Sequence, residues 1–212
     1  MGMGAGETYD TIGGALTMGE AIVVLRRLTG LSQQALAARI DMHVNYFSSV
    51  ERGKVRNPGL VTTSRIANAL GVSVGVLAAN FVRPSAIPLS RAAFQPSRPV
   101  EEGYDGASEM GAAIRLQRRR ADLTQERLSA ITGLHRGHLS SIEAGRKQNP
   151  GLGTIAKIAG GIEPRPAELS DLVADLARVF TGELTVHELR TRVPTPSGLP
   201  VSLGLPPEVT GT

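Results

Sequence analysis

The chain contains no cysteine and no tryptophan, and only 3% of its 212 residues are aromatic. The lack of cysteine excludes disulfides, thiol catalysis and cysteine-based zinc sites, and it fits a reducing cytoplasm. No apolar run approaches the roughly 18–20 residues that a membrane-spanning helix needs. The first residues, MGMGAGETYD, lack the basic and apolar regions of a signal peptide. We therefore expect a cytoplasmic protein with aliphatic cores and no membrane partner.

The net charge of +4 is distributed unevenly along the chain. Residues 17–82 hold seven basic and three acidic side chains, and residues 109–162 hold nine basic and four acidic ones. Residues 163–212 are acidic, with four basic and seven acidic side chains. Positive charge placed in this way is typical both of solvated helix faces and of a surface that binds a polyanion.

An internal repeat coincides with the two basic segments. The string SSVERGKVRNPGL at 48–60 returns as SSIEAGRKQNPGL at 140–152, an offset of 92 residues. Residues 18–70 align with 110–162 without a gap, and about 22 of the 53 aligned pairs are identical. A repeat of this length indicates a duplicated domain, because two copies are too few for a solenoid.

The apolar pattern within each copy is helical. In the first copy Ile22, Leu25 and Leu28 are spaced by three residues, and Gly30 is a suitable helix end. Ser32 is a suitable N-cap for the next helix. Continued along both copies, the pattern predicts five short helices in each. The second and third are separated by about three residues, which is the helix-turn-helix spacing.

Two longer strings then show a resemblance to a known family. LSQQALAARIDMHVNYFSSVERGKVRNPGL and LTQERLSAITGLHRGHLSSIEAGRKQNPGL resemble the Cro/C1-type helix-turn-helix domains of phage repressors and bacterial XRE regulators. Both share the family's L-[ST]-Q-x-x-L and I/V-E-x-G segments. The resemblance implies an all-α fold with two tandem five-helix lambda-repressor-like domains, each placing its third helix in the DNA major groove.

Two positions depart from the family pattern. The family has glycine at the turn of the motif, where Gly133 stands in the second copy but Asp41 in the first. Aspartate tolerates the left-handed backbone better than most residues, so we expect the turn to be kept. Gly137 lies inside the expected third helix of the second copy and costs about 1 kcal/mol of helix propensity relative to alanine.

The resemblance also implies roles for individual residues. We expect base readers on the third helices, where asparagine can pair with adenine and arginine with guanine: His43, Val44, Asn45, Ser49, His135, Arg136, Gly137, His138 and Ser141. We expect phosphate contacts from the second helices and from the loops after the third ones: Gln33, Lys54, Arg56, Gln125, Arg146 and Lys147. The alternative is that these residues are only solvated faces and loops. His135 and His138 lack a third metal ligand, so we predict no metal and no cofactor.

A buried ion pair is expected in each copy. Glu51 and Glu143 would be repelled by DNA unless a cation neutralises them. The family pairs this glutamate with an arginine of its first helix, and the matching residues are Arg26 and Arg118. We therefore predict the structural pairs Arg26–Glu51 and Arg118–Glu143.

The predicted organisation comprises six segments. They are a flexible N-terminus at 1–16, domain one at 17–82, a Pro-rich linker at 83–108, domain two at 109–165, a helical extension at 166–193 and a flexible tail at 194–212. The apolar stripe of the extension serves either the packing of domain two or self-association, and we expect a homodimer through residues 166–193. The extended linker would let the domains occupy neighbouring major grooves.

These observations predict a sequence-specific regulator of transcription that binds double-stranded DNA. Because the two reading helices differ, we expect an asymmetric bipartite site. RNA polymerase or another regulator is a candidate partner. The alternative is an antitoxin-like or scaffold protein whose helix-turn-helix domains bind protein. An enzyme is the least favoured class, because the sequence has no phosphate loop and no clustered carboxylates.

Overall fold

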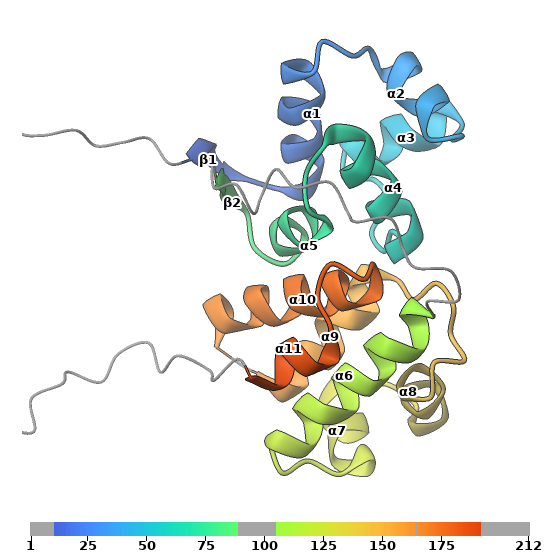
Figure 1. Cartoon of the computed structure of the whole chain (residues 1–212), viewed down its shortest axis with the longest axis vertical. Coiled ribbons are helices and arrows are strands. Elements are labelled where there is room, and N and C mark those ends of the chain that lie inside the picture. The colour runs from blue at the N-terminus through green and yellow to red at the C-terminus, as the bar shows by residue number, and fades with distance from the viewer. Residues whose placement is uncertain (1–10, 89–104, 164, 192–212) are drawn as a thin grey trace, which may run out of the picture.

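The computed structural model describes residues 11–88, 105–163 and 165–191. The first half contains β1 (Thr11–Leu16), α1 (Met18–Leu28), α2 (Gln33–Arg39), α3 (Val44–Glu51), α4 (Leu60–Leu70), α5 (Val74–Val82) and β2 (Ser85–Pro88). The second half contains α6 (Gly106–Arg120), α7 (Gln125–Thr132), α8 (Arg136–Glu143), α9 (Leu152–Ile162), α10 (Pro166–Phe180) and α11 (Val186–Thr191). Figure 1 shows the two helical halves stacked one above the other. The all-α class with two tandem five-helix domains is confirmed.

Side chains at the helix starts explain why the helices begin where they do. Thr17 and Glu20 form a capping box at α1, and the hydrogen bond from the Thr17 main chain lowers the pKa of the Glu20 carboxyl. Ser32 caps α2, and its equivalent Thr124 caps α7. In the second copy Asp105 caps a longer first helix. The caps satisfy main-chain N–H groups that have no partner within the helix.

The turn of the motif has the same backbone in both domains. Asp41 has φ 50° and Gly133 has φ 67°, so Asp41 adopts the left-handed conformation expected of it. At the end of the preceding helix the residue types are exchanged, with Gly30 at φ 70° and Asp122 at φ 53°. Each domain therefore has one glycine and one aspartate at two left-handed positions. The two copies have distributed the same backbone requirement differently.

The core of each domain lies beneath its third helix. Leu36 and Phe47 are fully buried in the first domain, and their equivalents Leu128 and Leu139 are fully buried in the second. At Gly19 a Cβ atom would lie 2.3 Å from the Glu51 carbonyl oxygen, so α1 crosses α3 at contact distance. Both copies have a Met-Gly pair at this place, and its glycine, Gly19 or Gly111, is a packing requirement because only glycine permits this approach.

Residues 166–191 form two helices that pack within the chain. The first of them, α10, begins at the predicted start of the extension, and it begins 92 residues after α5 begins, so it occupies the place of a fifth helix in the second copy. α10 packs most closely against α5 and α6. Its apolar stripe is buried within the chain, with Val173, Leu176 and Val179 fully inaccessible. The expectation of a homodimer through this stripe is therefore not supported by the packing. α11, expected as a second short helix, follows it.

Two further boundaries differ from those predicted. Residues 11–16, expected to be flexible, form β1, which pairs antiparallel with β2 at 85–88 within the expected linker. Asn80 donates a side-chain hydrogen bond of 2.8 Å to the Leu16 carbonyl and holds β1 against domain one. The rest of the linker up to residue 104, the first ten residues and the tail from 192 lie outside the described residues.

Candidate nucleic-acid interface

The third helices of the two domains, α3 and α8, lie on the same side of the molecule, at the right in Figure 1. Their inner faces are buried through Phe47 and Val50 in α3, and through Leu139 and Ile142 in α8. Their outer faces expose Asn45 and Tyr46 in α3, and Arg136, Gly137 and His138 in α8, while Val44 is half-buried. The outer faces thus expose four of the nine residues expected to read bases.

Some of the expected readers also have a structural task. His43 and His135 are the N-caps of α3 and α8, and each Nδ1 accepts a main-chain N–H, from Asn45 at 3.2 Å and from Gly137 at 3.1 Å. Only their Nε2 atoms remain available to a ligand. The Ser49 hydroxyl donates to the Asn45 carbonyl at 2.8 Å, so it can offer only its oxygen as an acceptor. Its equivalent Ser141 is half-buried.

A three-residue network lies beneath each third helix. Arg118 Nε and Nη2 donate to the two oxygens of Glu143 at 2.7 and 3.0 Å, and Gln125 Nε2 donates to Glu143 Oε2 at 2.8 Å. In the first domain Arg26 Nε donates to Glu51 Oε1 at 2.7 Å, and Gln33 donates to Glu51 Oε2. The hydrogen bond to Glu143 raises the pKa of the Arg118 guanidinium. Both expected ion pairs are therefore present.

The same networks constrain the two glutamines expected to contact phosphate. One N–H of each side-chain amide is used by the buried glutamate. The other N–H remains for a phosphate, because a primary amide has two. The glutamate thus fixes the orientation of the amide at the start of α2 or α7. The sequence indicated the arginine–glutamate pair but not the glutamine as its third member.

Arg136 has a partner of its own in the free chain. Its Nη2 lies 2.9 Å from Oε1 of Glu126 on α7, and both side chains are mostly exposed. A hydrogen bond from its own main-chain N–H and the charge of Arg136 lower the pKa of the Glu126 carboxyl. The equivalent positions in the first domain hold Val44 and Gln34, so this pair belongs to the second domain alone.

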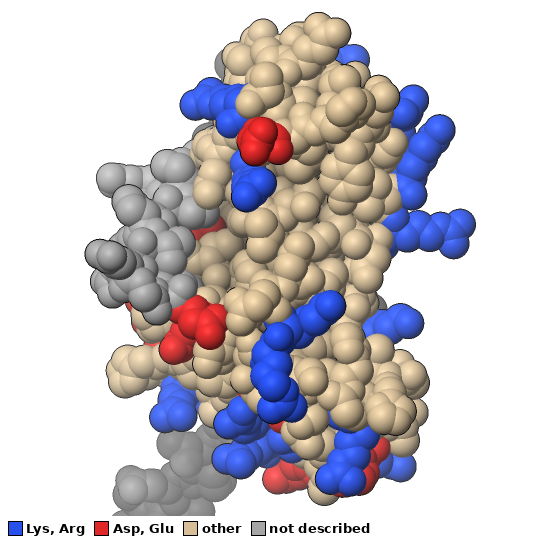
Figure 2. Space-filling view, turned by 90° about the vertical axis from the view of Figure 1, so that its right-hand side faces the viewer, with Lys and Arg blue, Asp and Glu red and all other residues tan. Residues whose placement is uncertain are grey.

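The loops after the third helices are basic in both domains. Lys54, Arg56, Arg146 and Lys147 are all exposed. Figure 2 shows the side of the molecule on which α3 and α8 lie. Lys and Arg side chains run across the lower half of this view, over the second domain, but lie mainly at the edges of the upper half. The positive charge on this side is therefore weighted toward domain two.

The NPGL strings of the two copies meet at the boundary between the domains, which we call the domain seam (residues 57–61 and 149–153). Leu60 N donates to the Pro150 carbonyl at 3.0 Å, and Leu152 N donates to the Pro58 carbonyl at 2.9 Å. Asparagine side chains repeat the exchange, with Val61 N donating to Asn149 Oδ1 at 3.2 Å and Gly153 N to Asn57 Oδ1 at 2.8 Å. Each bond maps onto the other by an offset of 92 residues, which is the signature of a two-fold interface.

A side chain at the centre of the seam would displace the asparagine side chains that bridge the domains. Gly59 and Gly151 form an antiparallel bridge. A Cβ on Gly151 would lie 2.1 Å from Asn57 Oδ1, and one on Gly59 would lie 2.4 Å from Asn149 Oδ1. From sequence alone the NPGL string predicts only a turn, because a proline disfavours helix in the residue before it. Its recurrence in both copies was the signal that it pairs with itself.

A second contact joins the domains through their fifth helices. Glu183, which follows α10, accepts hydrogen bonds from the Ser73 hydroxyl and from Val74 N at the start of α5. Ser170 on α10 donates to the Ala79 carbonyl at 3.2 Å. The domains are therefore packed against each other and are not independent units on an extended linker. The relative placement of α3 and α8 follows from these contacts.

Comparison with known proteins agrees with this architecture. A family model described as helix-turn-helix matches residues 24–77 and 114–166, which together make up just over half of the chain. The chain belongs to this helix-turn-helix family. Its two matches are the tandem domains of Cro/C1 type indicated by the resemblance.

Two curated relatives match single segments. A segment of 56 residues is 45% identical to the uncharacterized HTH-type transcriptional regulator y4dJ of Sinorhizobium fredii, covering 26% of this chain and 71% of that protein. A segment of 49 residues is 45% identical to control protein C.MunI of a Mycoplasma species, covering 23% of this chain and 65% of that protein. No solved structure matches the chain. No helix within the described residues is long and apolar enough to cross a membrane.

Proposed function

We propose that this chain is a transcription regulator that binds double-stranded DNA as a single-chain counterpart of a two-fold dimer. Membership of the helix-turn-helix family and the similarity to a transcriptional regulator support the coarser part of this proposal. The observation that carries the finer part is the reciprocal hydrogen bonding of the two NPGL strings. A two-fold arrangement turns α3 and α8 toward two half-sites that run in opposite directions.

The two half-sites differ in sequence although they are inverted relative to each other. The half-buried Val44 and the exposed Asn45 and Tyr46 of α3 stand where α8 has the exposed triplet Arg136-Gly137-His138. Arginine can make two hydrogen bonds to guanine, asparagine can make two to adenine, and valine can contact a thymine methyl group. The expected target is therefore an imperfect inverted repeat, with half-site centres about one helical turn apart.

Selection of bound duplexes from a random DNA library tests the proposal. We expect an enriched inverted site with unlike halves, bound by one chain per duplex in sedimentation measurements. Two chains per duplex would show that the seam does not replace dimerisation. Weak binding without sequence preference would instead favour the scaffold function, in which these domains bind protein.

A further inference from the structure

We infer that a pocket at the domain seam is a binding site for a phosphate group. The pocket has a volume of about 390 Å³ and lies between α8, the loop that follows it, the start of α9 and the first domain's half of the seam. Five side chains with hydrogen-bond donors line it: Asn57, His138, Lys147, Asn149 and Thr154. No residue that lines it is acidic.

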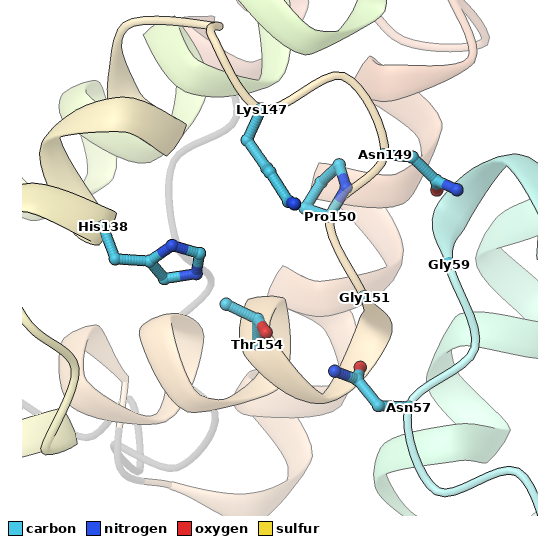
Figure 3. A pocket seen from close by; sticks show the side chains of 8 residues that line it. All are labelled: Asn57, Gly59, His138, Lys147, Asn149, Pro150, Gly151 and Thr154. Atoms are coloured by element: carbon cyan, nitrogen blue, oxygen red, sulfur yellow. The ribbon is translucent and has the colours of Figure 1, made fainter.

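The donors converge on the opening. Figure 3 shows His138 and Lys147 on one side of the space, with Thr154 between them and Asn57. Asn57 comes from the other domain, and its Oδ1 already accepts the Gly153 N–H at 2.8 Å. Its amide nitrogen therefore points into the pocket, as Figure 3 shows. A lysine ammonium with neutral donors around it suits an anion with several acceptor oxygens, which is the chemistry of phosphate.

The site is present on one side of the seam only. Under the offset of 92 residues, His138 corresponds to Tyr46 and Lys147 to Val55. The equivalent place on the other side therefore has no cation from these two positions. This distinguishes the pocket from the general positive charge of the loops, since both loops have basic residues but only Lys147 lines this pocket.

Two sources could supply the phosphate group. His138 lies on the outer face of α8, so a backbone phosphate between the two half-sites could enter the pocket, and this source depends on the proposed function. The volume also admits a small soluble phosphorylated compound. Both sources present the same tetrahedral anion to the same donors, and the test separates them.

The first arm uses the full chain and inorganic phosphate at constant ionic strength, with binding followed by calorimetry and by amide chemical shifts. Lys147→Val carries the residue of the equivalent first-domain position, and Lys157→Ala removes an exposed lysine outside the pocket as a control. We expect saturable binding, weakened about tenfold by K147V, as the loss of a hydrogen bond to a charged group entails, and unchanged by K157A. Equal weakening by both variants would show general charge attraction and would overturn the site.

The second arm uses duplex DNA with the selected sequence. If the source is DNA, K147V should lower the slope of log affinity against log salt by about 0.9, the value of one phosphate contact. A duplex with one neutral methylphosphonate between the half-sites should then be insensitive to K147V. Saturable phosphate binding without this DNA effect identifies a soluble ligand. The absence of both effects would overturn the proposal. If the chain binds phosphate but fails to select any DNA sequence, the proposed function is refuted and the phosphate site in the pocket still stands.

Discussion

In the first domain Glu51 accepts hydrogen bonds from Arg26 and Gln33. In the second domain Glu143 accepts them from Arg118 and Gln125. The same three side-chain types therefore meet beneath both third helices. On the outer faces of those helices the correspondence ends, because Asn45 and Tyr46 are exposed in one domain and Gly137 and His138 in the other. The buried frame has been kept while the exposed surfaces have diverged. After the duplication the buried network beneath the third helix stayed the same, and the exposed residues on its outer face changed.

The seam extends this comparison from the domains to their contact. NPGL is identical in both copies, and each copy is the binding partner of the other. A mutation in one string alone would break a self-complementary contact, because Gly59 faces Asn149 and Gly151 faces Asn57. The identity of the two strings is thus explained by their pairing.

Removing the buried carboxylate from one domain should have the largest effect on stability. Glu143→Ala would leave the buried Arg118 guanidinium without its ionic partner, which costs about 3–5 kcal/mol of unfolding free energy. Glu51→Ala should cost somewhat less, because Arg26 donates one hydrogen bond to its glutamate where Arg118 donates two. Chemical denaturation monitored by circular dichroism measures both.

The control for this comparison is Glu126→Ala, which removes an exposed carboxylate from its pair with Arg136. It should leave the denaturation midpoint nearly unchanged, because exposed ion pairs contribute little. Equal midpoints for E143A and wild type would mean that the Arg118–Glu143 pair adds nothing to stability. Loss of two-state behaviour in E143A would indicate that domain two unfolds while domain one persists.

The contact at the domain seam can be disrupted without changing the buried network of either domain. Gly151→Ala would place a Cβ atom 2.1 Å from Asn57 Oδ1, and such overpacking typically costs about 1–3 kcal/mol. We expect looser coupling of the domains, seen as faster hydrogen exchange at the Leu60 and Leu152 amides, and weaker DNA binding. Gly14→Ala is the control, since a Cβ there meets nothing within 4 Å. Unchanged exchange in G151A would show that the seam accommodates the added methyl group without opening.

Much of this organisation could be predicted from the sequence, and the failures have a common cause. The ten domain helices, the Asp41 turn and the two ion pairs were predicted because they depend on local pattern or on a repeated motif. The role of α10 was missed because GGIEP in the second copy replaces NALGV, and this obscured the alignment with α5. The seam, the β1–β2 pair and the Arg136–Glu126 contact join residues whose proximity only the tertiary packing creates.

Exchanging the readers should convert one half-site into the other. Replacing Val44-Asn45-Tyr46 by Arg-Gly-His should make the first half-site resemble the second, and the selected sequence should approach a perfect inverted repeat. Arg136→Ala alone should reduce discrimination at one base pair by about 1–3 kcal/mol if the arginine binds guanine. Gln33→Ala should weaken binding to all sequences alike, because phosphate contacts do not specify bases. A swapped chain that still selects the original site would place specificity outside these helices.

The smallest effect is expected from the pair that only domain two has. Glu126→Gln introduces the residue of the equivalent position 34, releases Arg136 and removes a carboxylate beside the reading helix. We expect DNA affinity to rise about two- to fivefold, the range that an exposed ion pair allows. Because the pKa of Glu126 is lowered, its carboxylate stays charged through the pH range in which an ordinary glutamate becomes protonated. The ion pair with Arg136 is lost only when the pH falls through that lowered pKa. The gain should therefore stay constant between about pH 5 and 8 in fluorescence-anisotropy titrations. The reciprocal change, Gln34→Glu, places a carboxylate opposite Val44, which offers no cation, and should weaken binding by repelling DNA. If E126Q binds no better than wild type while Q34E binds worse, the Glu126 charge is already displaced from Arg136 in the complex at no cost.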